Sequence, residues 1–222
     1  MPAALTFDMY GTLVDPLGIA RALEPHVADP DTVARRWRET QLRYAALLAA
    51  MEHYHDFAWV TERALEHALA TSGEDVDPDT RRELLAGYDA LEAFGDTRPG
   101  LERLRAEGHT LAVFSNGTRA MIERVVGAAG ITDCFDDLIS VDEVGTFKPS
   151  PRVYRHAAAR VGQQVADTWL ISANPFDVVG AATVGLRTAW VDRGTAAFDP
   201  LGPEPDIIVP DLGGLAAALD AT

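Results

Sequence analysis

Asp8 directly follows an apolar run, Ala4–Phe7, and precedes a Gly-Thr turn and a second acid, Asp15. The run reads as a strand that delivers a carboxylate to its end, and the glycine frees the backbone to bend around that carboxylate. Open α/β sheets place their chemistry at the carboxyl ends of strands, and carboxylates are recognised covalent nucleophiles. The pattern therefore indicates that Asp8 is the nucleophile of an enzyme.

Tyr10 is the most informative residue of this turn. A phosphatase built on the same turn would carry a second aspartate here, two residues after Asp8, to protonate a leaving alkoxide and help to hold Mg²⁺. Tyrosine instead indicates a leaving group that needs no proton and a site that needs no metal. A halide is such a leaving group, so the turn favours carbon–halogen chemistry on Asp8.

Polar residues occur in three further segments, at points where strands are predicted to end. They are Ser115 with Asn116, Lys148, and the segment Ser172–Asp177. Parallel strands bring their carboxyl ends to one edge of a sheet, so we expect these residues to meet Asp8 there. Lys148 stands out further because it is the only lysine beside 18 arginines. Ser-Asn-Gly alone is more often just a turn, but the four segments in this order form a strong joint signal.

Residues 16–94 read as helical, with apolar residues at helical spacing. The predicted helices of this block span about residues 31–54, 57–70 and 77–94. From residue 95 onward short apolar strands alternate with helices, which predicts βαβ units and a parallel sheet. The expected class is α/β, with a Rossmann-like parallel sheet core and an inserted all-helical cap. We expect the core to comprise residues 1–15 and 95–222, and the cap to comprise residues 16–94.

The composition excludes several classes of function. The chain has 222 residues, 47% of them hydrophobic, and a net charge of −15, which would repel nucleic acid and anionic membranes. No apolar stretch approaches the roughly 20 residues of a membrane helix, and the first strand starts too early for a signal peptide. We therefore expect a cytoplasmic protein. Cys134 is the only cysteine, which excludes internal disulfides and zinc or iron–sulfur ligation by cysteines.

Together these motifs resemble the haloacid dehalogenase superfamily, and within it the L-2-haloacid dehalogenases, over nearly the whole chain. The matching patterns are D-x-Y-G-T-L-x-D from Asp8, S-N-G from Ser115, Lys148-Pro149 with Tyr154 six residues after the lysine, and S-x-N-x-x-D from Ser172. The cap matches as well, because Trp37–Tyr44 fits the family's W-R-x-x-Q-L-x-Y helix. That helix contributes an arginine to the active site of the family.

The resemblance implies hydrolytic dehalogenation of L-2-haloacids to D-2-hydroxyacids. Asp8 would attack C2 of the substrate and expel halide with inversion, leaving an aspartyl ester. Lys148 would hold Asp8 ionised, since a nearby cation favours the charged form, and Asp177 would position or activate the water that attacks the ester. The residues that would orient these groups by hydrogen bonds are Thr12, Ser172, Asn174 and Tyr154.

The resemblance also implies a substrate site. Ser115 and backbone amides after Asp8 would bind the substrate carboxylate. The residues around the departing halide would be Arg38, Asn116 and Phe176, and those of the apolar wall around the alkyl group Tyr10, Leu42 and Phe57. No cofactor and no metal is implied, and the expected partners are a small 2-halocarboxylate and water. A homodimer is an open option, since dimers are common in this family, although no residue of the sequence establishes one.

Some of these residues also fit ordinary structural roles. Arg38 taken alone fits a cap-surface salt bridge better, Phe176 fits the core equally well, and Asp177 fits a helix N-cap. Ala173 stands where the family often has a second serine, and Glu39 would add an acid near the anion site if it points inward. These features bear on substrate range and rate, and they leave the reaction class unchanged.

Three alternatives stay open from the sequence. A Mg²⁺-dependent phosphatase or phosphotransferase of the same superfamily would use Asp8 as nucleophile and Asp177 as a metal ligand, but Tyr10 leaves no acid to protonate an alkoxide. A relative that opens a strained C–N ring, or cleaves the C–F bond of fluoroacetate, needs the same nucleophile. A non-catalytic descendant that binds a small carboxylate or another protein would be expected to lose Asp8 or Lys148, and both are present.

Overall fold

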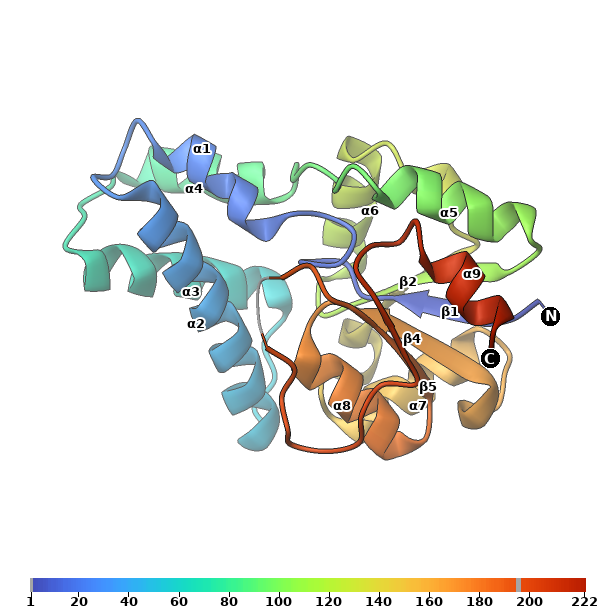
Figure 1. The fold of residues 1–222 in the computed structure, drawn as a ribbon. Helices are drawn as coiled ribbons and strands as arrows, with labels where there is room; N and C mark the ends of the chain where they lie inside the picture. The colour runs from blue at the N-terminus through green and yellow to red at the C-terminus, as the bar shows by residue number, and fades with distance from the viewer. Residues whose placement is uncertain (1, 195–196) are drawn as a thin grey trace.

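The computed structural model describes residues 2–194 and 197–222 of the chain. Six strands form one sheet in the order β3-β2-β1-β4-β5-β6, and all neighbours in it are parallel (Figure 1). The strands are β1 (Ala4–Phe7), β2 (Thr110–Ser115), β3 (Asp137–Ser140), β4 (Thr168–Ser172), β5 (Arg187–Val191) and β6 (Ile207–Val209). The expected α/β class with a parallel sheet is confirmed.

The register of β1 with its two neighbours determines where Asp8 lies at the edge of the sheet. Phe7 pairs with Val113 of β2 on one side and with Ile171 of β4 on the other. Asp8, one residue farther on, donates its backbone N–H to the carbonyl of Ile171 at 2.9 Å. Both faces of β1 and β4 are buried, which is why these strands are continuous apolar runs. The three central strands therefore end together beside Asp8.

Helices cover both faces of the sheet, with α5 and α6 on one face and α7 and α8 on the other (Figure 1). The helices of this part are α5 (Thr97–Ala106), α6 (Arg119–Ala128), α7 (Pro151–Arg160), α8 (Pro175–Val184) and α9 (Leu215–Asp220). The chain steps from β1 to β2 and β3, then returns past β1 to β4 and β5. Right-handed crossovers put the helices of these two directions on opposite faces. The reversal beside β1 is the switch point at which open α/β sheets bind ligands.

A block of helices lies between β1 and β2 in the chain. It comprises the 3-10 helix η1 (Pro16–Ile19), α1 (Ala20–Leu23), α2 (Pro30–Ala50), α3 (Phe57–Ser72) and α4 (Pro78–Tyr88). The last three begin after Asp29, Asp56 and Asp77, whose side chains accept backbone N–H groups of the first turn. α2 and α3 pack along each other, and the block lies beside the sheet, at the left of Figure 1. The expected helical insertion is confirmed.

Two boundaries in this block differ from the sequence-based expectation. α2 starts slightly earlier, because Asp29 caps it by accepting the N–H of Thr32, and it also ends earlier. α4 ends at Tyr88 rather than near residue 94. The chain beyond it returns toward the sheet in an extended form, and Ala93 makes an antiparallel bridge with Val14. A local pattern cannot reveal this pairing, since the two residues lie far apart in the sequence.

The two chain segments that connect the helical block to the sheet run side by side. We call residues 13–15 and 92–97 the cap linkers. Their backbone hydrogen bonds run from the N–H of Asp15 to the carbonyl of Glu92 at 3.0 Å, and from the N–H of Phe94 to the carbonyl of Leu13 at 3.1 Å. One of the cap linkers continues directly from the turn that carries Asp8, so the position of the helical block and the shape of that turn are connected.

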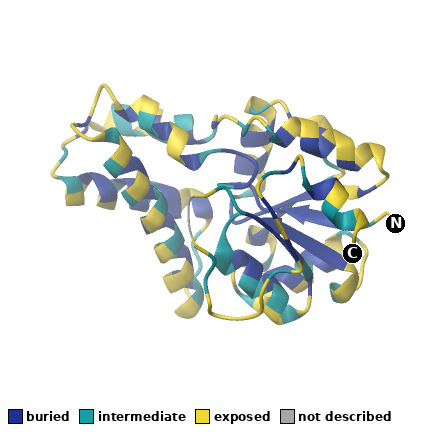
Figure 2. Ribbon diagram, viewed as in Figure 1, coloured by how far each residue is buried: buried dark blue, intermediate teal, exposed yellow. Residues whose placement is uncertain are grey.

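Buried residues concentrate in the sheet and on the helix faces that turn toward it (Figure 2). Three charged side chains are buried among them, Asp8, Lys148 and Asp177. A buried charge is costly unless it is paired, so such a group marks a place where function outweighs stability. Within residues 2–194 and 197–222, no helix combines the length and the apolar character that crossing a bilayer requires.

Candidate active site

Three side chains from separate segments bind the carboxylate of Asp8 at the carboxyl edge of the sheet. The Thr12 hydroxyl and the Asn174 amide donate to Oδ2 at 2.9 and 2.7 Å, respectively. The Lys148 ammonium donates to Oδ1 at 3.0 Å. These donors fix the direction of the carboxylate, and the ammonium compensates its charge. Asp8 and Asn174 lie beyond strand ends, as the sequence predicts, whereas Lys148 lies in the loop after β3 and the 3-10 helix η3 (Val141–Val144) rather than at a strand end.

Lys148 bridges two buried carboxylates. Its Nζ also donates to Oδ2 of Asp177 and to the carbonyl of Phe114, both at 2.8 Å, which uses all three ammonium protons. The backbone of Lys148 is fixed as well, because the side-chain oxygen of Asn116 accepts its N–H at 3.0 Å. Only 2% of Lys148 is exposed. The only lysine of the chain is thus the cation that two buried carboxylates share.

Asp177 lies in the first turn of α8 and faces Asp8 across the ammonium. The hydroxyl of Tyr154, from α7, donates to Oδ1 of Asp177 at 2.8 Å. Burial raises the pKa of Asp177 above the ordinary value of an aspartate; Lys148 offsets part of that rise, and the charge of Asp8 adds to it. Asn174 occupies the N-cap position of α8, so the N-cap interpretation of Asp177 is wrong.

The turn after β4 is tied to the turn after β1 by one hydroxyl. Thr12 donates to Asp8 and accepts the backbone N–H of Ala173 at 2.8 Å. Ser172 acts less directly than expected. Among the described residues its hydroxyl has one partner, the N–H of Asn174 at 3.1 Å. Ser172 therefore shapes the turn that presents the Asn174 amide, and does not itself bind Asp8 or Lys148.

Ser115, Asn116 and Phe176 lie at neighbouring strand ends. Ser115 is buried at the end of β2, and its hydroxyl accepts the N–H of Gly117 at 3.1 Å. Asn116 binds Lys148 through its oxygen, which leaves its amide protons to point elsewhere. Phe176 is only half-buried in the first turn of α8, so its interpretation as a core residue is wrong. An amide donor and an aromatic ring are thus both available at this edge of the sheet.

Arg38 reaches from α2 to the turn that carries Asp8. Its Nη2 donates at 3.0 Å to the carbonyl of Tyr10, which also accepts the Asn174 amide at 3.1 Å. The guanidinium lies 5.8 Å from the centre of the Tyr10 ring. The partner of Arg38 is therefore the nucleophile turn and not a surface acid. Glu39 is exposed, so it adds no acid to the site.

Two of the apolar residues named from the sequence, Tyr10 and Phe57, pack against each other beside the site. Phe57 is buried at the start of α3, with its ring centre 5.9 Å from that of Tyr10 and 6.2 Å from that of Phe147, the neighbour of Lys148. Leu42 is half-buried on α2. An aromatic layer between the helical block and the lysine loop restricts water around Asp8, which strengthens the electrostatic interactions there.

The hydroxyl of Tyr10 is buried and has no hydrogen-bond partner among the described residues. Burial raises the pKa of Tyr10 well above its usual value, and the neighbouring Tyr88 and Asp89 raise it further. A phenol with such a pKa holds its proton at neutral pH and is a poor general acid. Tyr10 therefore contributes its ring and its carbonyl to the site rather than a proton.

We expect Tyr10→Phe to stabilise the protein by about 1 kcal/mol, because an unpaired buried hydroxyl is destabilising. The melting temperature should rise by about 2–4 °C in a thermal unfolding scan. Tyr88→Phe is the matched control, since the buried Tyr88 hydroxyl donates to Gln41 at 2.7 Å and its loss should lower the melting temperature. A lower melting temperature for Tyr10→Phe would contradict the burial of an unpaired group.

A buried polar chain inside the helical block was not expected from the sequence. Tyr88 donates to Gln41, the Gln41 amide donates to Thr61 at 3.0 Å, and Thr61 donates to the carbonyl of Phe57 at 2.7 Å. Gln41 lies one turn from Arg38, so the chain holds α2, α3 and α4 in the arrangement that aims Arg38 at the site. The sequence offered one indication of this chain, because Gln41 stands at a position that helical spacing places on the apolar face of its helix.

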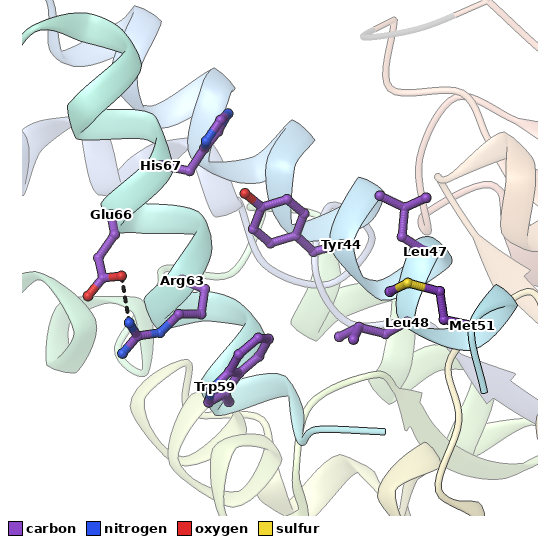
Figure 3. Close-up of a pocket in the computed structure, with 8 residues that line it drawn as sticks. All are labelled: Tyr44, Leu47, Leu48, Met51, Trp59, Arg63, Glu66 and His67. Atoms are coloured by element: carbon purple, nitrogen blue, oxygen red, sulfur yellow. Dashed lines mark hydrogen bonds and ion pairs between the residues drawn. The ribbon is translucent and has the colours of Figure 1, made fainter. Parts of the chain in front are cut away.

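A separate apolar groove lies on the helical block between α2 and α3 (Figure 3). It has a volume of about 570 Å³ and is lined by Tyr44, Leu47, Leu48, Met51, Trp59, Arg63, Glu66 and His67. Met51 is 61% exposed and Leu47 50%. The ion pair of Arg63 with Glu66, at 2.7 Å, lies on its α3 side. The groove shares no lining residue with the set around Asp8.

Comparisons with known proteins find relatives that match nearly the whole chain. The sequence profile of the haloacid dehalogenase-like hydrolases matches residues 2–185. The (S)-2-haloacid dehalogenase of Pseudomonas putida is 35% identical over 213 residues, which cover 96% of this chain and 94% of that protein. Haloacetate dehalogenase H-2 of Moraxella sp. (strain B) is 36% identical over 213 residues, 96% of this chain and 95% of that protein.

A solved structure gives the same result at the level of the fold. The L-2-haloacid dehalogenase from Xanthobacter autotrophicus with chloropropionic acid covalently bound matches with a TM-score of 0.90 and 31% sequence identity, over 100% of both chains. Profile, sequence identity and fold all extend across the segments that carry Asp8, Lys148 and Asp177. The chain therefore belongs to the haloacid dehalogenase superfamily and, within it, to the L-2-haloacid dehalogenase family.

Proposed function

We propose that this protein hydrolyses L-2-haloacids to D-2-hydroxyacids through an ester on Asp8, without a metal. The observation that carries the proposal is the buried set of Asp8, Lys148 and Asp177, in which one ammonium contacts both carboxylates at 3.0 and 2.8 Å. The raised pKa of Tyr10 supports a leaving group that departs without a proton. A halide meets that condition, and an alkoxide does not.

In the first step, an oxygen of Asp8 attacks C2 of the substrate. A C–O bond forms as the C–X bond breaks, the bonding pair leaves with the halide, and the configuration at C2 inverts. Arg38, Asn116 and Phe176 surround the halide in this proposal, because a guanidinium, an amide donor and an aromatic edge all stabilise an anion. Ser115 and the backbone amides after Asp8 bind the substrate carboxylate.

In the second step, water attacks the carbonyl carbon of the ester. Asp177 accepts a proton from that water, and Tyr154 and Lys148 hold the Asp177 carboxylate in place through contacts at 2.8 Å. The ester C–O bond to the product breaks, the product oxygen takes up a proton, and Asp8 is regenerated as a carboxylate. The products are the D-2-hydroxyacid, halide and one proton.

The proposal predicts that the rate of ester hydrolysis falls on the acid side at a pH above the ordinary pKa of an aspartate. Asp177 accepts a proton only when ionised, and its pKa is raised, chiefly by burial. Activity should therefore fall as pH drops through that raised pKa, rather than only near about pH 3.9. The measurement is kcat against pH under conditions where ester hydrolysis limits the rate. If kcat instead falls only at the ordinary pKa of an aspartate, the general base is a group other than Asp177.

The function is tested by halide release from each enantiomer of 2-chloropropionate in EDTA. We expect halide from the L-enantiomer alone, with the D-configuration in the lactate formed. p-Nitrophenyl phosphate with Mg²⁺ serves as the parallel substrate for a phosphatase of the same superfamily. Turnover of the phosphate ester without any halide release would reject the proposal.

An isotope experiment tests the ester directly. Under single-turnover conditions in H₂¹⁸O, the label should enter the carboxylate of Asp8, because water attacks the ester carbonyl and not C2. The hydroxyl oxygen of the product then comes from Asp8 and carries no label. Label in the product after one turnover would instead mean direct displacement by water, with Asp8 as a general base.

We further propose that the chain is divided into a catalytic core, residues 1–15 and 95–222, and a cap, residues 16–94. The side-by-side cap linkers support this division, and Arg38 contacts the core from the cap through the Tyr10 carbonyl. A cytoplasmic location is also part of the proposal, and the buried free thiol of Cys134 suits a reducing compartment.

We propose that two copies of the chain pair through the groove between α2 and α3. Leu47 and Met51 expose apolar area there, and Arg63 and Glu66 supply both signs of charge beside it. A two-fold axis sets each residue of one copy against the complementary residue of the other, so charges of both signs can pair. The net charge of −15 on each copy opposes association, and apolar contact must outweigh it.

Sedimentation equilibrium at micromolar concentration tests this pairing. We expect a dimer for the wild type and a monomer for Leu47→Asp, because an acid placed in the contact adds repulsion without disturbing a buried residue. Leu201→Asp is the control, since Leu201 is 78% exposed and lies outside the groove. A monomeric wild type, or a dimer that survives Leu47→Asp, would contradict this interface.

A further inference from the structure

Arg193 follows β5 and contacts the nucleophile turn at the carbonyl of Thr12. We infer that Arg193 is a positioning residue for Asp8 that acts through Thr12. The inference rests on the proposed function and deepens it, since it names a residue for the same site that neither the strand-end pattern nor the family motifs indicated.

The guanidinium of Arg193 meets three groups. Its Nη2 donates to the carbonyl of Thr12 at 2.7 Å. Nη1 and Nη2 together pair with the carboxylate of Asp96 at 3.0 and 3.1 Å. The guanidinium carbon lies 3.9 Å from the centre of the Phe94 ring. With 10% of the side chain exposed, water competes little for these contacts.

Asp96 keeps the guanidinium in place. It also accepts the N–H of Leu212 at 2.8 Å, so the carboxylate is fixed from two sides. Burial acts to raise the pKa of Asp96, but the hydrogen bonds from Arg193 and the Leu212 amide outweigh it, and the pKa is lowered. Asp96 therefore stays ionised across the neutral range.

Thr12 connects this pair to the nucleophile. Its carbonyl accepts from Arg193, while its hydroxyl donates to Asp8 at 2.9 Å and accepts from Ala173 at 2.8 Å. Fixing the carbonyl fixes the peptide plane that follows the Thr12 side chain, and hence the direction from which the hydroxyl reaches Asp8. A purely structural ion pair would need only Asp96, and it would not need the Thr12 carbonyl.

Phe94 and Asp96 belong to one of the cap linkers, and Thr12 directly precedes the other. Arg193 thus joins three segments: the end of β5, the returning cap linker and the nucleophile turn. Arg193 accordingly holds the turn in the geometry for attack when the cap linkers are in place.

Arginine is suited to this position for a geometric reason. Its planar fork binds a carboxylate with two parallel hydrogen bonds while one nitrogen still reaches a carbonyl, and its face stacks on an aromatic ring. An ammonium is a compact point charge and cannot satisfy all three partners at their present separations. Arg193→Lys should therefore keep the charge but lose the geometry.

The test compares Arg193→Met and Arg193→Lys with wild type. We expect kcat for halide release to fall by about 10–100-fold in Arg193→Met, with KM changed by less than about threefold, because a misplaced nucleophile slows chemistry and leaves substrate binding intact. Arg193→Lys should show an intermediate loss. The matched control is Arg187→Met, which removes a guanidinium at the start of β5 that stacks on Trp169 of β4 at 4.1 Å. It should keep the wild-type kcat.

Backbone hydrogen exchange gives a second readout that does not depend on turnover. The N–H groups of Gly11, Thr12 and Leu13 are hydrogen-bonded within the turn. In Arg193→Met these amides should exchange at least about tenfold faster, while amides of β4 and α7 should not change. This local change would identify an effect on the turn rather than a general loss of stability.

Each outcome decides the inference. Wild-type kcat and wild-type exchange of the turn in Arg193→Met would overturn it, as would a lower melting temperature with unchanged kcat. If Arg193→Met does not fold, Arg193→Lys decides by the same two readouts. If the wild type releases no halide, the proposed function fails, but faster exchange confined to the turn still supports Arg193 as the residue that positions it.

Discussion

Asp8→Asn lowers kcat for halide release by roughly 10⁴-fold or more in our expectation, because it removes the nucleophile and not merely its environment. An amide oxygen carries no negative charge to displace a halide from C2. The variant should still fold, since the amide oxygen can accept from Thr12 and Asn174 as the carboxylate does at 2.9 and 2.7 Å. It also brings the formal charge of the buried cluster from −1 to zero, which offsets the loss of one contact with Lys148.

The measurement is halide release, with the melting temperature taken on the same samples. Asp167→Asn is the matched control, because Asp167 is an exposed aspartate in the 3-10 helix before β4, at the opposite end of the sheet. It should keep wild-type activity. Residual activity within about a hundredfold of wild type in Asp8→Asn, with the protein free of deamidation, would remove Asp8 from the role of nucleophile.

Lys148→Met has the second large effect, and it acts on stability as well as on activity. Removing the only cation leaves Asp8 and Asp177 as buried carboxylates without a counter-charge, which costs about 3–5 kcal/mol. The melting temperature should fall by roughly 6–20 °C at neutral pH. Activity should fall about 10³-fold or more, because the ammonium no longer aims Asp8 or holds Asp177. Arg103→Met, which breaks an exposed pair with Glu107, is the control and should change stability by less than about 1 kcal/mol.

A second substitution separates the two effects of Lys148→Met. Adding Asp177→Asn removes one of the stranded charges, so the double variant should regain much of the lost melting temperature and none of the activity. Recovery of activity would mean that Lys148 only balances charge. Equal melting temperatures of the single and double variants would mean that Asp177 is already protonated in Lys148→Met.

Acid should also restore the stability of Lys148→Met. Burial already raises the pKa of Asp177 in the native protein, and Lys148 opposes that rise. Without Lys148, the folded pKa lies still farther above the unfolded one, so the folded state binds protons more tightly than the unfolded state. Stability is then greatest at low pH and is lost as pH rises toward the folded pKa. Denaturant unfolding at several pH values measures this dependence.

The placement of the candidate site follows from a short-range rule, which is why the sequence could predict it. Asp8 and the turn that carries Asn174 follow the apolar runs of β1 and β4, and parallel strands bring the ends of such runs together. Lys148 needed one further fact, its solitary occurrence in the chain. The helical block could also be predicted from the sequence, because Asp56 and Asp77 are typical N-cap residues directly before two of its helices.

Contacts between segments that are distant in sequence were not accessible in this way. Nothing local indicates that the Phe114 carbonyl accepts from Lys148, or that Arg193 reaches the Thr12 carbonyl. The position of Asp177 before an apolar helix also predicts an N-cap, but Pro175 starts α8 earlier and gives that position to Asn174. Partners of these kinds depend on the packing of strands and linkers, which a pattern of residue types does not specify.

Lys148 has a practical consequence outside catalysis. It is the only side-chain amine among 222 residues, and it is 2% exposed with all three ammonium protons engaged. Acylating reagents that modify lysines indiscriminately in other proteins have no surface lysine to react with here. Modification of this amine requires the cluster to open and the ammonium to lose a proton. The extent of acylation at one known atom therefore reports how often the catalytic centre becomes accessible to solvent.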